Sequence, residues 1–189
     1  TVFKHIESMG VMVIHHKKNK GKGAALKTGM NYYLKHFSAS HSGVITCDAD
    51  GQHDFSDIKR LTDYMTCNEN TVFLGVRQFR WESTPFRSWF GNQITRQLFY
   101  YLTTKKLHDT QTGLRGLPLS CVIDAVKIPH DGFDFEMVML KHITDHCAFE
   151  QIPIKTIYLK NNESSHFDVL HDSIRVYRAL FALYYKRST

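Results

Sequence analysis

Two carboxylates and an amide follow a short apolar segment in the stretch GVITCDADGQH, residues 43–53. The apolar residues 44–47 predict a buried strand, with Asp48, Asp50 and Gln52 directly after it. In open α/β sheets ligands bind beyond the carboxyl ends of the strands, and Mg²⁺ and Mn²⁺ prefer oxygen ligands of these kinds. The sequence therefore predicts a divalent-metal site that bridges a diphosphate. The alternative is an acidic turn or helix N-cap that contacts only water.

A basic, glycine-containing segment lies upstream, KKNKGKGAAL at residues 17–26. Its glycines let backbone N–H groups face a ligand, and the helix that begins here favours anions at its N-terminus. The segment lacks the Gly-Lys-Ser/Thr ending of a Walker loop, and Leu26 stands where a GxGxxG fingerprint needs its third glycine. A solvated basic loop is the alternative interpretation.

Three arginines stand at the ends of predicted elements. Arg77 ends an apolar segment, Arg87 precedes an aromatic helix, and Arg115 closes the stretch DTQTGLR. The planar guanidinium suits phosphate oxygens, although a single arginine is more often a surface cation. Asp109, which opens the same stretch, is a candidate general base or acceptor-orienting group, with a plain loop residue as the alternative.

The elements that would position these residues alternate in type. Short apolar segments predict strands at residues 11–14, 44–47, 72–76 and 152–158. Helical spacing joins Leu26 to Phe37, Ile58 to Met65, and Phe90 to Tyr101. Such alternation predicts one α/β domain with a mostly parallel sheet flanked by helices, and an amphipathic helix follows at residues 174–187.

Composition limits the classes of function. The 189 residues carry a formal net charge of +6, which favours anionic partners such as phosphorylated molecules or acidic membranes. Four cysteines without a CxxC pair indicate a reducing compartment, and no apolar run approaches a membrane span. His142, His146 and Cys147 lack the accompanying residues of a zinc motif.

Six motifs together resemble the family 2 glycosyltransferases of GT-A fold, in particular the polyprenyl-phosphate sugar transferases that include dolichyl-phosphate mannose synthase. They are NKGKGAAL (19–26), CDADGQH (47–53), LGVR (74–77), RSWFGN (87–92), DTQTGLR (109–115) and NNESSHF (161–167). Each motif alone is weak, but their order and spacing are specific, and the resemblance covers nearly the whole chain.

The resemblance implies inverting transfer of a sugar from a nucleotide diphosphate to a polyprenyl phosphate, whose ionised phosphate needs no dedicated base. It assigns Mg²⁺ or Mn²⁺ to Asp48, Asp50 and Gln52. The roles it implies for the other residues are nucleotide-sugar binding by Asn19, Lys22, Asp48, Ala49 and Asp50, contact with phosphate or acceptor by Arg77, Arg87, Ser165 and His166, and catalysis by Asp109 and Arg115.

The resemblance also implies a domain organisation. We expect a GT-A domain over residues 1–167 and an amphipathic C-terminal helix over 168–189. The family's first strands, with their Pro-x-x-Asn-Glu and Asp-Asp-Gly-Ser motifs, do not occur in this sequence, so we expect an N-terminally incomplete sheet. Because the implied acceptor stays in the bilayer, we expect the protein in the cytoplasm, peripheral at the cytoplasmic face of an anionic membrane. The sequence is also compatible with a homo-oligomer.

Two other classes of function remain. One is a non-catalytic fragment or interaction domain of the same fold. The other is a basic nucleic-acid-binding domain, favoured by the rings and cations of residues 79–90 but opposed by Asp48 and Asp50. Stabilisation by UDP- or GDP-sugars that requires Mn²⁺ would favour the glycosyltransferase.

Overall fold

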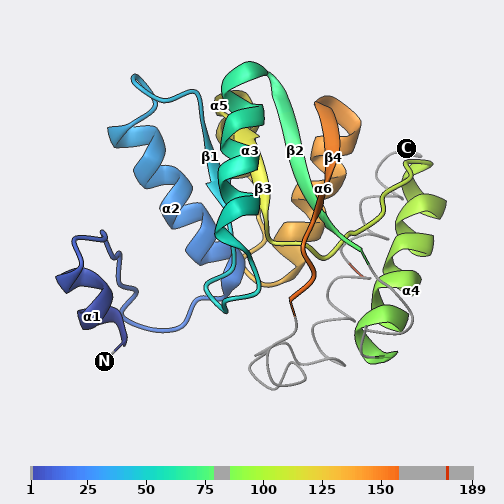
Figure 1. The fold of residues 1–189 in the computed structure, drawn as a ribbon, viewed down its shortest axis with the longest axis horizontal. Helices are drawn as coiled ribbons and strands as arrows, with labels where there is room; N and C mark the ends of the chain where they lie inside the picture. Colours follow the sequence, from blue (N-terminus) through green and yellow to red (C-terminus); the bar gives the residue numbers. More distant parts are fainter. Residues whose placement is uncertain (1, 79–85, 158–177, 179–189) are drawn as a thin grey trace.

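The computed structural model of this chain describes residues 2–78, 86–157 and 178. Within them, one sheet has its strands in the order β1-β3-β2-β4 (Figure 1). The strands are β1 (Gly43–Thr46), β2 (Thr71–Arg77), β3 (Arg115–Pro118) and β4 (Ala148–Ile154).

The direction of the strands brings the candidate residues to one edge of the sheet. β3 pairs antiparallel with both β1 and β2, whereas β2 and β4 pair in parallel. β1, β2 and β4 therefore run in the same direction, and their carboxyl ends share an edge with the amino end of β3. The prediction of a common direction is confirmed for these three strands. Their pairing is mixed rather than mostly parallel, because the reversed β3 lies between β1 and β2.

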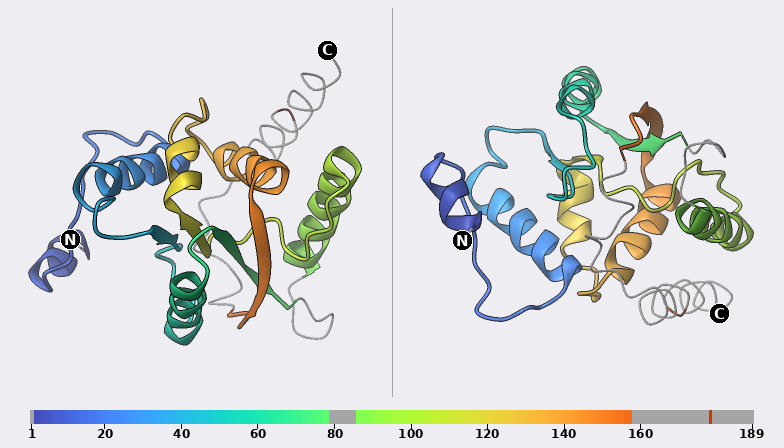
Figure 2. Two further views of the ribbon diagram at one scale, coloured as in Figure 1. Left: turned by 90° about the horizontal axis from the view of Figure 1, so that it is seen from above. Right: turned by 60° about the horizontal axis from the view of Figure 1, so that its bottom comes forward.

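Helices cover both faces of the sheet. On one face, α3 (Phe55–Cys67) packs through Leu61 against Phe73 and Leu114. The other face carries α2 (Lys22–His36), α5 (Leu119–Ala125) and α6 (Asp134–His146), and α4 (Phe86–Thr103) adds to the same core at its side (Figure 2). β2 shows why both layers form: its side chains alternate between the two cores, so its interior is buried throughout.

Two of the predicted strands need correction. Residues 11–14 form no strand: none of the sheet's four strands pairs with them in the described residues, and Val11 and Met12 are exposed. Apolar residues alone do not make a strand, because its backbone groups need a neighbouring strand to bond. The strand predicted at residues 152–158 in fact begins at Ala148 and ends at Ile154. Its beginning was missed because the first half of the strand alternates between exposed and partly buried residues and forms no apolar run.

Other expectations are confirmed or lie outside the described part. The helices expected around Leu26, Ile58 and Phe90 are present as α2, α3 and α4, and α1 (Val2–Ser8) forms near the N-terminus. Of the expected C-terminal helix only Arg178 is described. Among the described residues, no helix combines the length and apolar character needed to cross a membrane.

Candidate active site

An ion-pair triad forms where β1 ends and α2 and α6 begin. The Lys22 ammonium lies 2.7 Å from Asp48 Oδ1 and 2.7 Å from Glu136 Oε2. Lys22 is the first residue of α2, and Glu136 belongs to the first turn of α6. The triad thus joins the glycine-containing basic segment to the Asp-x-Asp turn.

The carboxylate of Asp48 is closely surrounded. A Cβ added to Gly113 would lie 2.3 Å from Asp48 Oδ2, so the carboxylate rests directly on the glycine backbone. Thr46 donates its hydroxyl to the carbonyl of Gly113 at 2.9 Å, which holds the end of β1 to the same loop. Only a glycine permits this approach, which explains the glycine in the stretch DTQTGLR.

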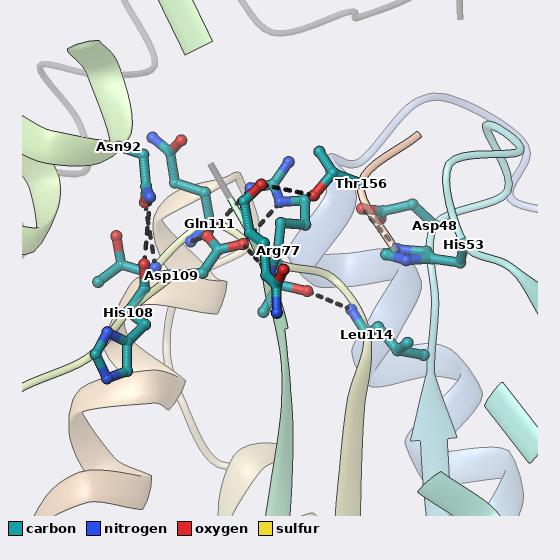
Figure 3. A network of polar contacts seen from close by, with 12 residues as sticks. Asp48, His53, Arg77, Asn92, His108, Asp109, Gln111, Leu114 and Thr156 are labelled. Carbon is teal, nitrogen blue, oxygen red and sulfur yellow. Dashed lines mark hydrogen bonds and ion pairs between the residues drawn. The ribbon is translucent and has the colours of Figure 1, made fainter. Parts of the chain in front are cut away.

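The neighbours of Asp48 also set its charge. His53 Nε2 lies 3.8 Å from Asp48 Oδ2, which is longer than a hydrogen bond but within reach of an ion pair, and its ring is almost fully buried (Figure 3). Burial alone would raise the pKa of Asp48, but His53 and Lys22 hold that pKa well below its usual value of 3.8. Burial likewise opposes the charge on Lys22, yet Glu136 and Asp48 raise its pKa above 10.5. Both groups are therefore ionised at neutral pH.

The rest of the Asp-x-Asp turn faces solvent. Ala49 and Asp50 are exposed, and Asp50 Oδ1 accepts the backbone N–H of Gln52 at 3.0 Å. The turn then leads into α3, whose N-cap Asp54 accepts the N–H of Ser56. The ammonium of Lys155, just after β4, lies 2.8 Å from Asp54 Oδ2, so the turn is fastened to the far strand of the sheet.

Arg77 and Asp109, predicted separately, bind each other (Figure 3). Arg77 Nε donates to Asp109 Oδ2 at 2.7 Å and Nη2 donates to Oδ1 at 3.1 Å. Asp109 is buried and also accepts the N–H of Gln111 at 2.9 Å. A carboxylate engaged in this way holds an arginine at the strand end and is poorly placed to act as a base.

Asn92 of α4 supports the loop that carries Asp109. Its side chain is buried, accepts the N–H of Thr110 at 3.4 Å and donates to the carbonyl of His108 at 3.5 Å. The RSWFGN motif therefore contributes an amide that shapes the neighbouring loop (Figure 3).

Arg115 lies in the interior. Its guanidinium donates to the carbonyls of Thr112 at 3.1 Å and Glu136 at 2.9 Å, while Nη2 has no hydrogen-bond partner among the described residues. Burial lowers its pKa, against the attraction of Glu136 and Asp109. This position suits an arginine that fixes the start of α6, and with it Glu136, rather than one that reaches a substrate.

The remaining candidates divide into two groups. Asn19 is exposed, and its Oδ1 accepts the N–H of Gly21 at 2.9 Å, which shapes the turn before α2. The side chains of Arg87, Ser165 and His166 lie outside the described part of the structure.

Sequence reasoning missed three residues of the site: Glu136, His53 and Gly113. Glu136 belongs to none of the six motifs, and its signal was a carboxylate in the GFDFE stretch that opens a helix. His53 and Gly113 stood inside recognised motifs, but only the fold shows that both pack on Asp48.

The donor set of the turn fits a divalent ion of the Mg²⁺ or Mn²⁺ type. These ions require one or two protein carboxylates and take their other ligands from water and substrate phosphates. Asp48, Asp50 and the amide of Gln52 are such donors. In the described residues no group of three or more His, Cys, Asp or Glu side chains is arranged to hold a metal.

A pocket of about 340 Å³ opens beside the Arg77–Asp109 pair. Its lining includes the cationic side chains of Arg77 and Arg96 and comprises Val76, Arg77, Gln78, Arg96, His108, Gln151 and Pro153. Anionic groups would be attracted to such a lining.

Comparison with known proteins identifies the class. The model of glycosyl transferase family 2 matches residues 2–122, so the chain belongs to this family. Its fold is that of a GT-A glycosyltransferase: the crystal structure of glucosyl-3-phosphoglycerate synthase from Mycobacterium tuberculosis, in complex with phosphoglyceric acid, superposes with a TM-score of 0.71 at 15% identity, covering 95% of this chain and 63% of that one.

Three curated proteins are similar to the chain in sequence. An uncharacterized protein of Methanocaldococcus jannaschii is 27% identical over 85% of this chain and 67% of its own length. The human dolichyl-phosphate beta-glucosyltransferase is 27% identical, with 82% and 49% covered. The UDP-N-acetylglucosamine–dolichyl-phosphate N-acetylglucosaminyltransferase of Methanococcus voltae is 26% identical, with 78% and 60% covered. The chain thus spans about half to two thirds of the length of these proteins.

Proposed function

We propose that this chain carries the catalytic site of an inverting glycosyltransferase that moves a sugar from a nucleoside diphosphate to a polyprenyl phosphate. The observation that carries the proposal is the ionised Asp48, held on Gly113 at the end of β1 and close to the loop of Asp109. Two relatives whose names state a dolichyl-phosphate acceptor support the choice of lipid.

The proposed reaction is a displacement at the anomeric carbon. An oxygen of the acceptor phosphate attacks this carbon, while its bond to the diphosphate breaks and the leaving nucleoside diphosphate takes the electron pair. Attack from the opposite side inverts the configuration. The acceptor phosphate is already ionised, so no residue has to remove a proton, which agrees with Asp109 being paired with Arg77.

We assign roles to the residues accordingly. Asp48, Asp50 and Gln52 would hold Mg²⁺ or Mn²⁺, which when bound neutralises charge on the diphosphate. Asn19 shapes the turn in front of α2, and Ala49 and Asp50 are exposed, so a nucleotide can approach them from solvent. Arg77, fixed by Asp109, presents positive charge toward the pocket, where a phosphate group would bind.

A transfer assay tests the proposal. The protein is incubated with radiolabelled UDP- or GDP-sugars, Mn²⁺ and dolichyl phosphate in detergent, and label in the lipid phase is counted. We expect transfer by the parent and a loss of about 100-fold in Asp50→Asn, because charge at the leaving group is no longer offset. Asp63→Asn serves as the control, because it removes an exposed carboxylate on α3, away from the Asp-x-Asp turn.

Donor binding is measured separately by thermal unfolding. A nucleotide present at 100 times its Kd stabilises the fold by about 2.7 kcal/mol, and we expect this gain to require Mn²⁺. Equal transfer by Asp50→Asn and the parent would contradict the metal assignment. Salt-sensitive binding of oligonucleotides without any response to nucleotide sugars would contradict the enzyme class.

Residence at a membrane surface is part of the proposal, since a polyprenyl acceptor stays in the bilayer. The sequence at residues 174–187 combines an aromatic stripe with flanking cations, a pattern typical of interfacial helices. Flotation with anionic liposomes should therefore carry the full chain more strongly than a variant that ends before Asp172. Equal flotation of the two would contradict this attachment.

A further inference from the structure

The ammonium of Lys22 occupies the negatively charged centre of the candidate site. It lies 2.7 Å from a carboxylate oxygen of Asp48 and 2.7 Å from one of Glu136. The three side chains are mostly shielded, with exposed fractions of 25%, 28% and 15% for Lys22, Asp48 and Glu136. Shielding from water strengthens such interactions, so the charge of Lys22 contributes strongly to the field at Asp48.

We propose that Lys22 is a built-in counter-ion that competes with the divalent ion for Asp48, and that Glu136 is the positioning residue that retains Lys22 when the ion binds. This inference rests on the metal assignment of the proposed function. The reason is electrostatic: a divalent ion on Asp48 and an ammonium in contact with the same carboxylate repel each other within a few ångströms.

The backbone of Lys22 is fixed, so the exchange must take place in its side chain. A Cβ on Gly21 would lie 2.4 Å from the carbonyl oxygen of Asp131, and the N–H of Gly23 donates to the carbonyl of Gly132 at 3.2 Å. The start of α2 is therefore packed against the loop that precedes α6. The four-carbon stem of lysine can still turn its ammonium away from Asp48.

Glu136 contacts the same ammonium as Asp48. It belongs to α6, not to the Asp-x-Asp turn, and Arg115 donates to its backbone carbonyl at 2.9 Å, which holds this helix start in place. If an ion were bound to Asp48, Lys22 would keep a carboxylate partner in Glu136 and would stay near the anionic groups of a bound nucleotide. Without Glu136, the ammonium would have Asp48 as its carboxylate partner in the triad.

Calorimetry with Mn²⁺ alone, without nucleotide, tests the competition. We expect Lys22→Met to bind Mn²⁺ about tenfold more tightly than the parent, because the competing charge is gone. Lys22→Gln, which keeps a neutral donor near Asp48, should act in the same direction and provides a second variant if the first unfolds. Lys20→Met is the matched control: it removes an exposed lysine from the same segment and should leave the affinity within about twofold.

A double-mutant cycle tests the role of Glu136. Glu136→Gln should weaken Mn²⁺ binding in the parent, where Lys22 is driven onto Asp48, but leave it nearly unchanged in the Lys22→Met background. An equal loss in both backgrounds would make Glu136 an independent contributor and overturn its assigned role.

The outcomes separate this inference from the proposed function. If Lys22→Met and Lys22→Gln bind Mn²⁺ no more tightly than the parent, Lys22 does not compete with the ion for Asp48. The same conclusion follows if neither the parent nor the two variants bind Mn²⁺ detectably. If the Lys22 variants bind Mn²⁺ more tightly but the parent transfers no sugar, the competition stands and the glycosyltransferase proposal fails. If the parent transfers sugar and the variants bind Mn²⁺ as the parent does, only the competition fails.

Discussion

Asp48 remains ionised in a shielded place because its neighbours are cationic or polar. His53 and Lys22 together outweigh the effect of burial and lower its pKa. A carboxyl whose pKa falls on folding stabilises the folded state above its unfolded pKa, and this contribution is lost as the pH falls toward the folded pKa. For Asp48 the loss begins below about pH 4, near the ordinary value of 3.8.

We therefore predict a specific acid response for Asp48→Asn. Urea unfolding at several pH values between 3 and 6 should show the variant less stable than the parent at pH 6, with the difference shrinking below pH 4. Asp63→Asn, which removes an exposed carboxylate from α3, is the control. A difference for Asp48→Asn that does not change between pH 3 and 6 would contradict the shifted pKa.

Gly113 is the second residue whose replacement has a defined effect. In Gly113→Ala the new Cβ would meet Asp48 Oδ2 at 2.3 Å, so the carboxylate or the loop must move. We expect a cost of about 1–3 kcal/mol in unfolding free energy and weaker binding of nucleotide diphosphate with Mn²⁺, measured by calorimetry.

Gly29→Ala is the matched control for this substitution. Gly29 lies in α2, where a Cβ meets nothing within 4 Å, so an alanine there should stabilise the helix by about 0.5–1 kcal/mol and leave binding unchanged. Unaltered binding in Gly113→Ala would show that the position of Asp48 is unimportant for the ligand.

At the scale of elements, the pair of Arg77 and Asp109 joins the end of β2 to the loop that leads into β3. Asp109→Ala would leave a largely buried guanidinium without its carboxylate, and we expect a loss of about 3–5 kcal/mol in unfolding free energy. The double variant Arg77→Ala/Asp109→Ala should be less destabilised than the sum of the single variants. Strict additivity in urea unfolding would mean that the pair contributes nothing as a pair.

Sequence patterns were sufficient for elements whose signal is local. The strand of residues 71–77 has an apolar interior and was predicted at 72–76. The helix pattern from Ile58 to Met65 was also found, in a helix that begins three residues earlier and ends two residues later. β3 was missed because RGLP is short and contains a glycine and a proline, so it becomes a strand only through its neighbours. The strand predicted at residues 11–14 was wrong for the opposite reason: the segment is apolar, but it has no partner strand among the described residues.

The same distinction applies to the site. The motifs placed Asp48, Lys22, Arg77 and Asp109 at element ends, and the structure brings them together in pairs. Which residue pairs with which could not be read from the sequence, because it depends on the reversed β3 and on the packing of α6. Arg115 shows the limit: its motif indicated a catalytic group, but its depth in the fold indicates a structural one.

At the scale of the whole molecule, apolar side chains are concentrated on the surface near α1 and α2. Met9, Val11, Met12 and Ile14 are 69%, 53%, 61% and 44% exposed. Met12 and Ile14 also line a hollow of about 300 Å³ with Tyr32 and Phe37. An apolar surface of this kind binds hydrophobic molecules in solution.

We predict that the folded protein binds the dye ANS at this hollow. Met12→Ser/Ile14→Ser should reduce the dye fluorescence while changing the unfolding free energy by no more than about 0.5 kcal/mol for each exposed position. Ile123→Ser, an exposed apolar residue on α5, is the control and should leave the fluorescence unchanged. Equal fluorescence of the parent and the double variant would place the dye elsewhere.

The reversed strand between β1 and β2 has a consequence for how the chain folds. β1 bonds only to β3 within the described sheet, and Thr46 and Arg115, which face each other there, are 69 positions apart. During synthesis β1 therefore leaves the ribosome long before its partner exists, while α3 can already contact β1 and β2. Closing so long a loop is slow, and an unpaired strand edge is prone to aggregation in the meantime. The step that docks β3 thus completes the sheet and, by bringing Gly113 under Asp48, assembles the candidate site in the same event.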